Sequence, residues 1–68
     1  MHKFPEETPK KGQLVIAYCK SGSFYFARYT KALTWGGYKL KFVNINSNGL
    51  WHNDVIGWNN IPKETDTL

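Results

Sequence analysis

Basic residues fill the middle of the chain. Between Glu7 and Asp54 no residue is acidic and seven are Lys or Arg, so this stretch carries +7 although the whole chain of 68 residues carries only +4. Such a concentration of positive charge attracts nucleic acid or an acidic protein surface. The plainer alternative is a set of solvated surface lysines, because only one of the seven is Arg, the residue that makes bidentate phosphate contacts. The seven cations are Lys10, Lys11, Lys20, Arg28, Lys31, Lys39 and Lys41.

The chain has 11 aromatic residues, and several of them are interspersed with these cations. Small β domains bind single strands by stacking bases on such rings, each stacked base contributing roughly 1 to 3 kcal/mol. Trp and Tyr also anchor protein partners, and Asn side chains near a Trp supply adaptable hydrogen bonds. The sequence has no RNP, KH or zinc-knuckle signature that would favour nucleic-acid binding over protein binding. The predicted binding residues are Arg28, Lys39, Lys41, Tyr25 and Trp35, and a second candidate surface is Trp51, His52 and Asn53.

Residues with catalytic potential are few and poorly spaced. Ser21 or Ser23 could join His52 and Asp54 in a hydrolytic triad, but no Gly-x-Ser-x-Gly elbow presents a nucleophile. Cys19 has apolar neighbours, which favours a small core side chain over a reactive thiol. One Cys and two scattered His do not have the paired spacing of a zinc site. The sequence therefore predicts no metal, no cofactor and no enzymatic activity.

Length and cysteine content indicate the class of protein. Residues 1–68 are enough for one small β domain, with residues 1–12 as an extended lead-in and residues 63–68 as a frayed tail, and space for an enclosed active site is scarce. A single Cys forms no intramolecular disulfide, which suits a reducing cytoplasm. No stretch approaches the roughly 20 apolar residues of a membrane span. We expect a cytoplasmic protein with no membrane partner.

Short apolar and aromatic runs separated by turn residues predict about five strands. Leu14–Cys19 is rich in β-branched residues, and Ser21-Gly22-Ser23 turns it into the aromatic run 24–30. Residues 31–37 are expected to form a loop, ended by two glycines, with room for one helical turn. Further strands are predicted at 38–45, near 50–51 after an Asn-rich turn, and at 55–58. The apolar phase slips after Phe42, which predicts either a bulge or a strand that is covered on both faces.

These strands predict an all-β fold, a small antiparallel meander that forms either an open curled sheet or an SH3-like barrel. Burying each large apolar side chain contributes roughly 1.5 to 3 kcal/mol. Exposed edge strands also make a homodimer, or a self-associating structural or assembly component, an alternative. The predicted core is Leu14, Ile16, Phe24, Phe26, Leu40, Phe42, Val55 and Trp58.

The ends of the chain resemble a family of short phage and prophage proteins of unknown function. The matching segments are Phe4-Pro5, Gly12–Val15, Phe24–Tyr29 and the closing 55–62, which reads Val-Ile-Gly-Trp-Asn-Asn-Ile-Pro. The family closes with a Val-Thr-His-Trp-x-Pro-Leu-Pro motif. Here Gly57 replaces its His and Asn60 its first Pro, so no role of those two residues carries over. The resemblance implies a mobile-element gene in a bacterial host and no particular activity.

Charge, size and resemblance together favour a non-enzymatic binding protein that docks on an acidic surface of a host protein. Such docking would inhibit a host or defence system that handles nucleic acid. The alternative function is direct binding of nucleic acid by the same basic residues.

Overall fold

The computed structural model describes residues 1–47 and 49–61, so Asn48 and the predicted tail at 63–68 lie outside the described residues. The described chain is all-β, as predicted, and none of its segments is a helix that could span a membrane. It has six strands: β1 (His2–Lys3), β2 (Leu14–Cys19), β3 (Phe24–Thr34), β4 (Gly37–Asn44), β5 (Trp51–His52) and β6 (Val55–Asn60).

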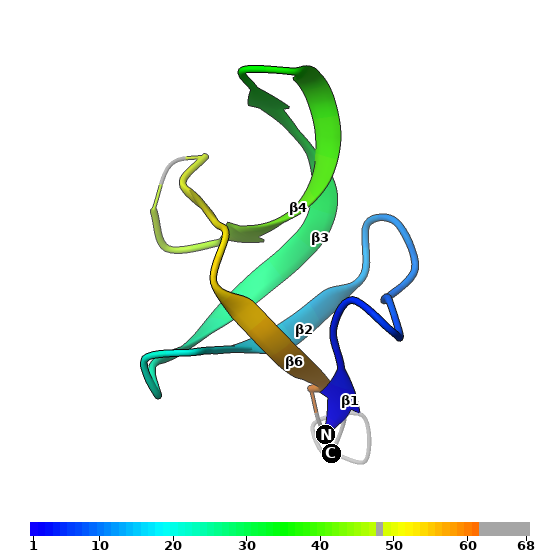
Figure 1. The fold of residues 1–68 in the computed structure, drawn as a ribbon, viewed down its shortest axis with the longest axis vertical. Coiled ribbons are helices and arrows are strands. Elements are labelled where there is room, and N and C mark those ends of the chain that lie inside the picture. Colours follow the sequence, from blue (N-terminus) through cyan, green and yellow to red (C-terminus); the bar gives the residue numbers. More distant parts are fainter. Residues whose placement is uncertain (48, 62–68) are drawn as a thin grey trace, which may run out of the picture.

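All six strands form one antiparallel sheet in the order β1-β6-β2-β3-β4-β5. The middle strands β2 to β5 form the predicted meander. After β5 the chain returns across the sheet, so that β6 pairs with β2 and β1 pairs with β6 (Figure 1). No ladder in the described ranges joins the outer strands β1 and β5, so the sheet is open and curled.

The β3–β4 hairpin is longer than the sequence predicts. Residues 31–34, expected in a loop, continue β3, and Trp35–Gly36 form the turn. Gly37 follows the turn with φ +99°, a conformation that favours glycine, and the Thr34 hydroxyl donates to its carbonyl at 2.7 Å. Prediction of a loop failed because two glycines signal a chain reversal without showing how far the flanking strands extend.

The distal half of this hairpin projects from the sheet. The ladder with β2 ends at Arg28, and β5 pairs only with Phe42 and Val43. Residues 30–41, which we call the arm, therefore pair in strand ladders only with one another. Figure 1 shows the arm curling away from the other strands, and the molecule is 43 Å long but only about 20 Å wide.

The core lies on the opposite sheet face from the one that the sequence predicts for β2 and β3. Phe24 and Phe26 were expected inside but are exposed, as is Leu40, whereas Leu14 and Ile16 are half-buried. Phe42, Val55 and Trp58 are buried as predicted. The positions of β2 and β3 that face the core include the small residues Val15, Ala17 and Ala27, which are fully buried together with Phe42 of β4. The buried apolar side chains are Val15, Ala17, Cys19, Ala27, Tyr29, Ala32, Phe42, Val55 and Trp58.

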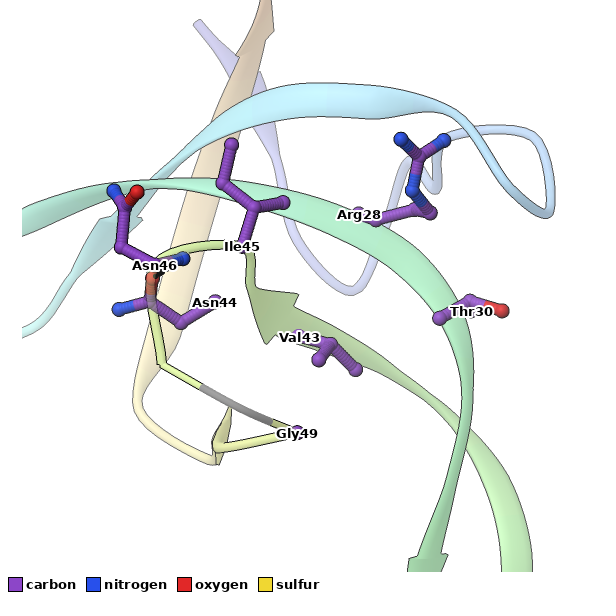
Figure 2. Close-up of a pocket in the computed structure, with 7 residues that line it drawn as sticks. All are labelled: Arg28, Thr30, Val43, Asn44, Ile45, Asn46 and Gly49. Carbon is purple, nitrogen blue, oxygen red and sulfur yellow. Dashed lines mark hydrogen bonds between the residues drawn. The ribbon is translucent and has the colours of Figure 1, made fainter.

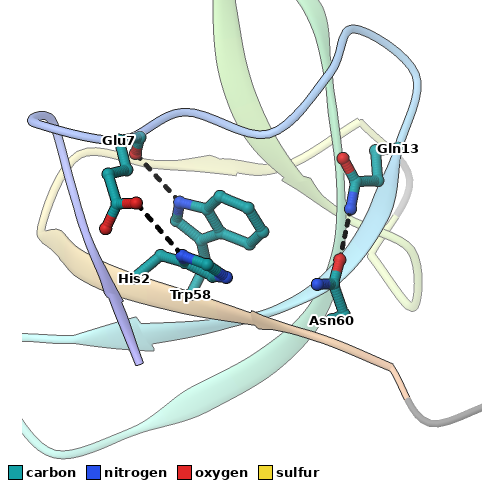
Figure 3. A network of polar contacts seen from close by, with 5 residues as sticks. All are labelled: His2, Glu7, Gln13, Trp58 and Asn60. Atoms are coloured by element: carbon teal, nitrogen blue, oxygen red, sulfur yellow. Dashed lines mark hydrogen bonds and ion pairs between the residues drawn. The ribbon is translucent and has the colours of Figure 1, made fainter.

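The lead-in closes the core instead of merely trailing from it. Phe4 packs edge-on against Phe42, with ring centroids 4.8 Å apart. The Trp58 indole donates to the Glu7 carbonyl at 2.9 Å, and the His2 ring stacks on that indole at 4.2 Å (Figure 3). At the other end of the lead-in, Gln13 donates to the side chain of Asn60 (Figure 3).

Of the two explanations predicted for the phase slip after Phe42, a bulge is absent from the continuous β3–β4 register. The other, cover on both faces, is what the structure has, because Phe42 is buried on one face and Val43 is half-buried on the other. The irregularity in the described sheet falls between β2 and β6, at Tyr18 and Cys19.

Candidate functional site

Three predicted cations share the sheet face opposite the core, which we call the outer face. Residues directly paired in an antiparallel ladder point to the same face, as do residues two apart along a strand. Arg28 pairs with Val43, and Lys41 and Lys39 follow at steps of two along β4. The structure thus aligns Arg28, Lys39 and Lys41 along one side of the hairpin.

Arg28 stands at the junction of sheet and lead-in. Its Nη1 donates to the Gly12 carbonyl at 2.8 Å, which holds the guanidinium beside the lead-in. It also lines an open pocket with Thr30 and Val43, facing the turn that follows β4 (Figure 2). The other lining side chains are amides and an isoleucine, a lining suited to hydrogen bonding and apolar contact.

Lys41 joins the two surfaces that the sequence predicts separately. Its Nζ donates to Asn53 Oδ1 at 2.9 Å and lies 4.9 Å from the centre of the Trp51 ring. The Trp51 indole in turn donates to the Leu33 carbonyl at 3.2 Å, so β5 braces the arm. Trp51 and Asn53 therefore belong with the outer-face cations.

Tyr25 and His52 lie on the core face, away from Arg28. Their rings stack at 3.9 Å and 4°, and Asn44 Nδ2 lies 3.5 Å from His52 Nε2. Desolvation raises the pKa of the Tyr25 phenol, and negative charge on Cys19 and Asp54 adds to the shift. Two of the predicted binding residues thus form a structural pair beside the core.

Cys19 is only 2% exposed and lies near this pair. Burial raises the pKa of its thiol, and the hydrogen bond to Asp54 and the charge of that carboxylate act in the same direction. A protonated, enclosed thiol is a poor nucleophile, so its chemistry is that of a small core side chain.

The arm presents an apolar surface of which the sequence predicts only Trp35 as a binding residue. Trp35 at the tip is fully exposed, Tyr38 is 70% and Leu33 is 65% exposed, and Leu40 is 40% exposed. Leu33 pairs with Tyr38, and Leu40 lies two positions along β4, so the three share one face. Tyr38 and Leu40 alternate with Lys39, a pattern that predicts one face against the core and one face in solvent. The prediction is wrong for these residues because no local sequence signal shows that the hairpin extends beyond the sheet.

No group of three or more His, Cys, Asp or Glu in the described parts of the chain lies close enough to hold a metal ion. Comparison with known proteins finds no match among protein families, curated proteins or solved structures. The resemblance to short phage proteins therefore stays a prediction.

Proposed function

We propose that this protein is a non-enzymatic binding module that docks its arm on an acidic surface of a partner protein. One observation carries the proposal: a projecting hairpin exposes Leu33, Tyr38 and Leu40 on one face and Trp35 at its tip. Exposed Lys31 shares that apolar face, whereas Lys39 lies on the opposite face of the hairpin. Protein interfaces likewise combine apolar anchors such as Trp and Tyr with charged residues.

Charge supports an acidic partner. The arm contains Lys31, Lys39 and Lys41 and no acidic residue, and Arg28 continues the cationic row on the outer face. Like charges opposed across an interface cost several kcal/mol, whereas opposite charges accelerate encounter. A partner cleft that has an apolar wall for one face of the arm and carboxylates for the opposite face would contact both parts of the arm.

The setting that we propose is the bacterial cytoplasm, with a host protein as partner. It follows from the resemblance to phage proteins and from the unpaired Cys19, and it would make the protein an inhibitor that occupies its target. The target class that we propose is a host or defence system that handles nucleic acid, and an acidic patch on such a protein would attract the basic arm.

Co-purification from a bacterial lysate tests the docking role. We expect the double variant Lys39→Glu with Lys41→Glu, and separately Trp35→Ala, to lose proteins that the wild-type chain retains, as measured by mass spectrometry. The matched control is Lys10→Glu with Lys11→Glu, which makes the same change in net charge away from the arm. Equal recovery of the same proteins by wild type and both arm variants would exclude the arm as the docking element.

A further inference from the structure

The outer face of the β2–β3 hairpin carries exposed aromatic rings that neither the core nor the arm uses. Phe24 is 63% and Phe26 is 44% exposed. Tyr18 lies opposite Phe24 in the ladder, with ring centroids 6.2 Å apart. Exposed apolar rings that lie together on one side of a sheet form a contiguous patch, and such patches are candidate interaction surfaces.

Cations lie at both ends of this aromatic surface. Exposed Lys20 follows β2 at the turn next to Phe24, and Arg28 lies four residues beyond Phe24 on the same strand, about 13 Å away. Arg28 uses Nη1 on the Gly12 carbonyl, and a guanidinium has five N–H donors in total. No position of β2 or β3 on this face is acidic.

We propose that Tyr18, Phe24, Phe26 and Arg28, the stacking platform, bind single-stranded nucleic acid. Bases would stack on Phe24 and Phe26, and phosphates would contact Arg28 and Lys20. Single strands are bound in this way because every base has a flat apolar face, whereas a duplex hides its base faces within the stack. The stacking platform lies outside the arm, and its partner is a polyanion whose bases are exposed for stacking.

The direct test is fluorescence anisotropy with labelled oligothymidylate and oligouridylate of about 12 nucleotides, within the usual site size of a small β domain. We expect both to bind more tightly than a duplex of the same length and to weaken as salt rises, since phosphate contacts release counterions. Comparison of oligouridylate with oligodeoxyuridylate, which differs from it only in the 2′-hydroxyl, shows whether that group contributes.

Substitutions on the platform separate base stacking from nonspecific electrostatic attraction. The double variant Phe24→Ala with Phe26→Ala should bind oligonucleotides about tenfold or more weakly, whereas Phe24→Trp should keep the wild-type affinity. Phe24→Leu should lose affinity, because leucine keeps apolar area but has no ring. Both phenylalanines are exposed, so these variants should keep the wild-type circular dichroism spectrum.

Tyr38→Ala is the matched control, since it removes an exposed aromatic ring from the arm. It should leave oligonucleotide affinity unchanged but lower recovery of a protein partner, so the two proposed sites can fail separately. The platform proposal is overturned by no binding at low salt, by a duplex that binds as well as the single strands, or by wild-type affinity in Phe24→Leu. A protein partner lost in the Phe24→Ala and Phe26→Ala variant, without oligonucleotide binding, would also overturn it.

Discussion

At the scale of single residues, side-chain size decides which face of the central strands is buried. Ala17 and Ala27 are completely inaccessible, whereas Phe24 and Phe26 on the neighbouring positions face solvent. A large ring in place of either alanine would force the curled sheet apart, and overpacking of this kind typically costs about 1 to 3 kcal/mol. The larger core rings are Tyr29, Phe42 and Trp58, and Phe4 of the lead-in packs against the first two.

Cys19 gives a pH-dependent prediction at the same scale. Its pKa is raised in the folded protein above the ordinary value of 9.0, so the folded state holds the thiol proton to higher pH than the unfolded chain does. The corresponding stability is fully present below about pH 9 and falls as pH rises further. Urea unfolding at about pH 7 and about pH 10 should show a larger loss for wild type than for Cys19→Ala. Parallel losses in the two proteins would contradict this assignment.

At the scale of elements, β1 depends on the absence of a side chain in β6. A Cβ on Gly57 would lie 2.6 Å from Met1 Sδ and 2.9 Å from the His2 carbonyl oxygen. Backbone cannot yield as a flexible side chain can, so the close approach of β1 to β6 requires glycine at this position.

Gly57→Ala should therefore displace β1 and lower the free energy of unfolding by about 1 to 3 kcal/mol. The His2 ring would leave the Trp58 indole, and the amides of β1 should exchange with solvent faster. Hydrogen exchange and urea unfolding measure the two effects. Gly22→Ala is a control with a different cause, because its φ of +95° strains the turn without a clash against β1.

The arm is held by β5, an element of only two residues. Trp51→Phe keeps a ring beside Lys41 but removes the N–H that donates to the Leu33 carbonyl. We expect a cost of about 1 kcal/mol and faster exchange of arm amides, with the β2–β3 ladder unchanged. NMR hydrogen exchange resolves the two regions, and uniform acceleration in both would show that Trp51 stabilises the sheet rather than the arm.

At the scale of the whole molecule, the open sheet leaves little edge for a second copy. Each outer strand, β1 and β5, has two residues, and Lys31, Lys39 and Lys41 place positive charge along the arm. Short edge strands and lysines oppose edge-to-edge pairing.

Light scattering after size exclusion should therefore return a mass near 7.9 kDa that does not change with concentration. A mass that rises with concentration would favour the alternative of a self-associating component, and the Lys31→Ala variant would then show whether charge limits it. An arm that remains free in solution is also a requirement of the proposed docking role.

The sequence by itself determined the all-β class, the β2–β3 hairpin, the acid-free basic stretch and the burial of Phe42, Val55 and Trp58. These follow from local patterns, such as apolar runs bounded by turn residues, or from composition. The alignment of Arg28, Lys39 and Lys41 also follows from alternation once strands of the right register are known. The sequence could not supply that register, because it depends on where the paired strands end.

Only the tertiary structure decided which face of the hairpins is buried, where the arm begins and which aromatics remain exposed. Alternation in β2 and β3 is compatible with either face being inside, since both Leu14-Ile16-Tyr18 and Val15-Ala17-Cys19 are apolar. The structure buries the smaller set, and Phe4 of the lead-in packs against the core that it forms. Because side chains alternate between the two faces of a strand, Phe24 and Phe26 are then on the outside, and with Arg28 they form the surface on which the nucleic-acid proposal depends.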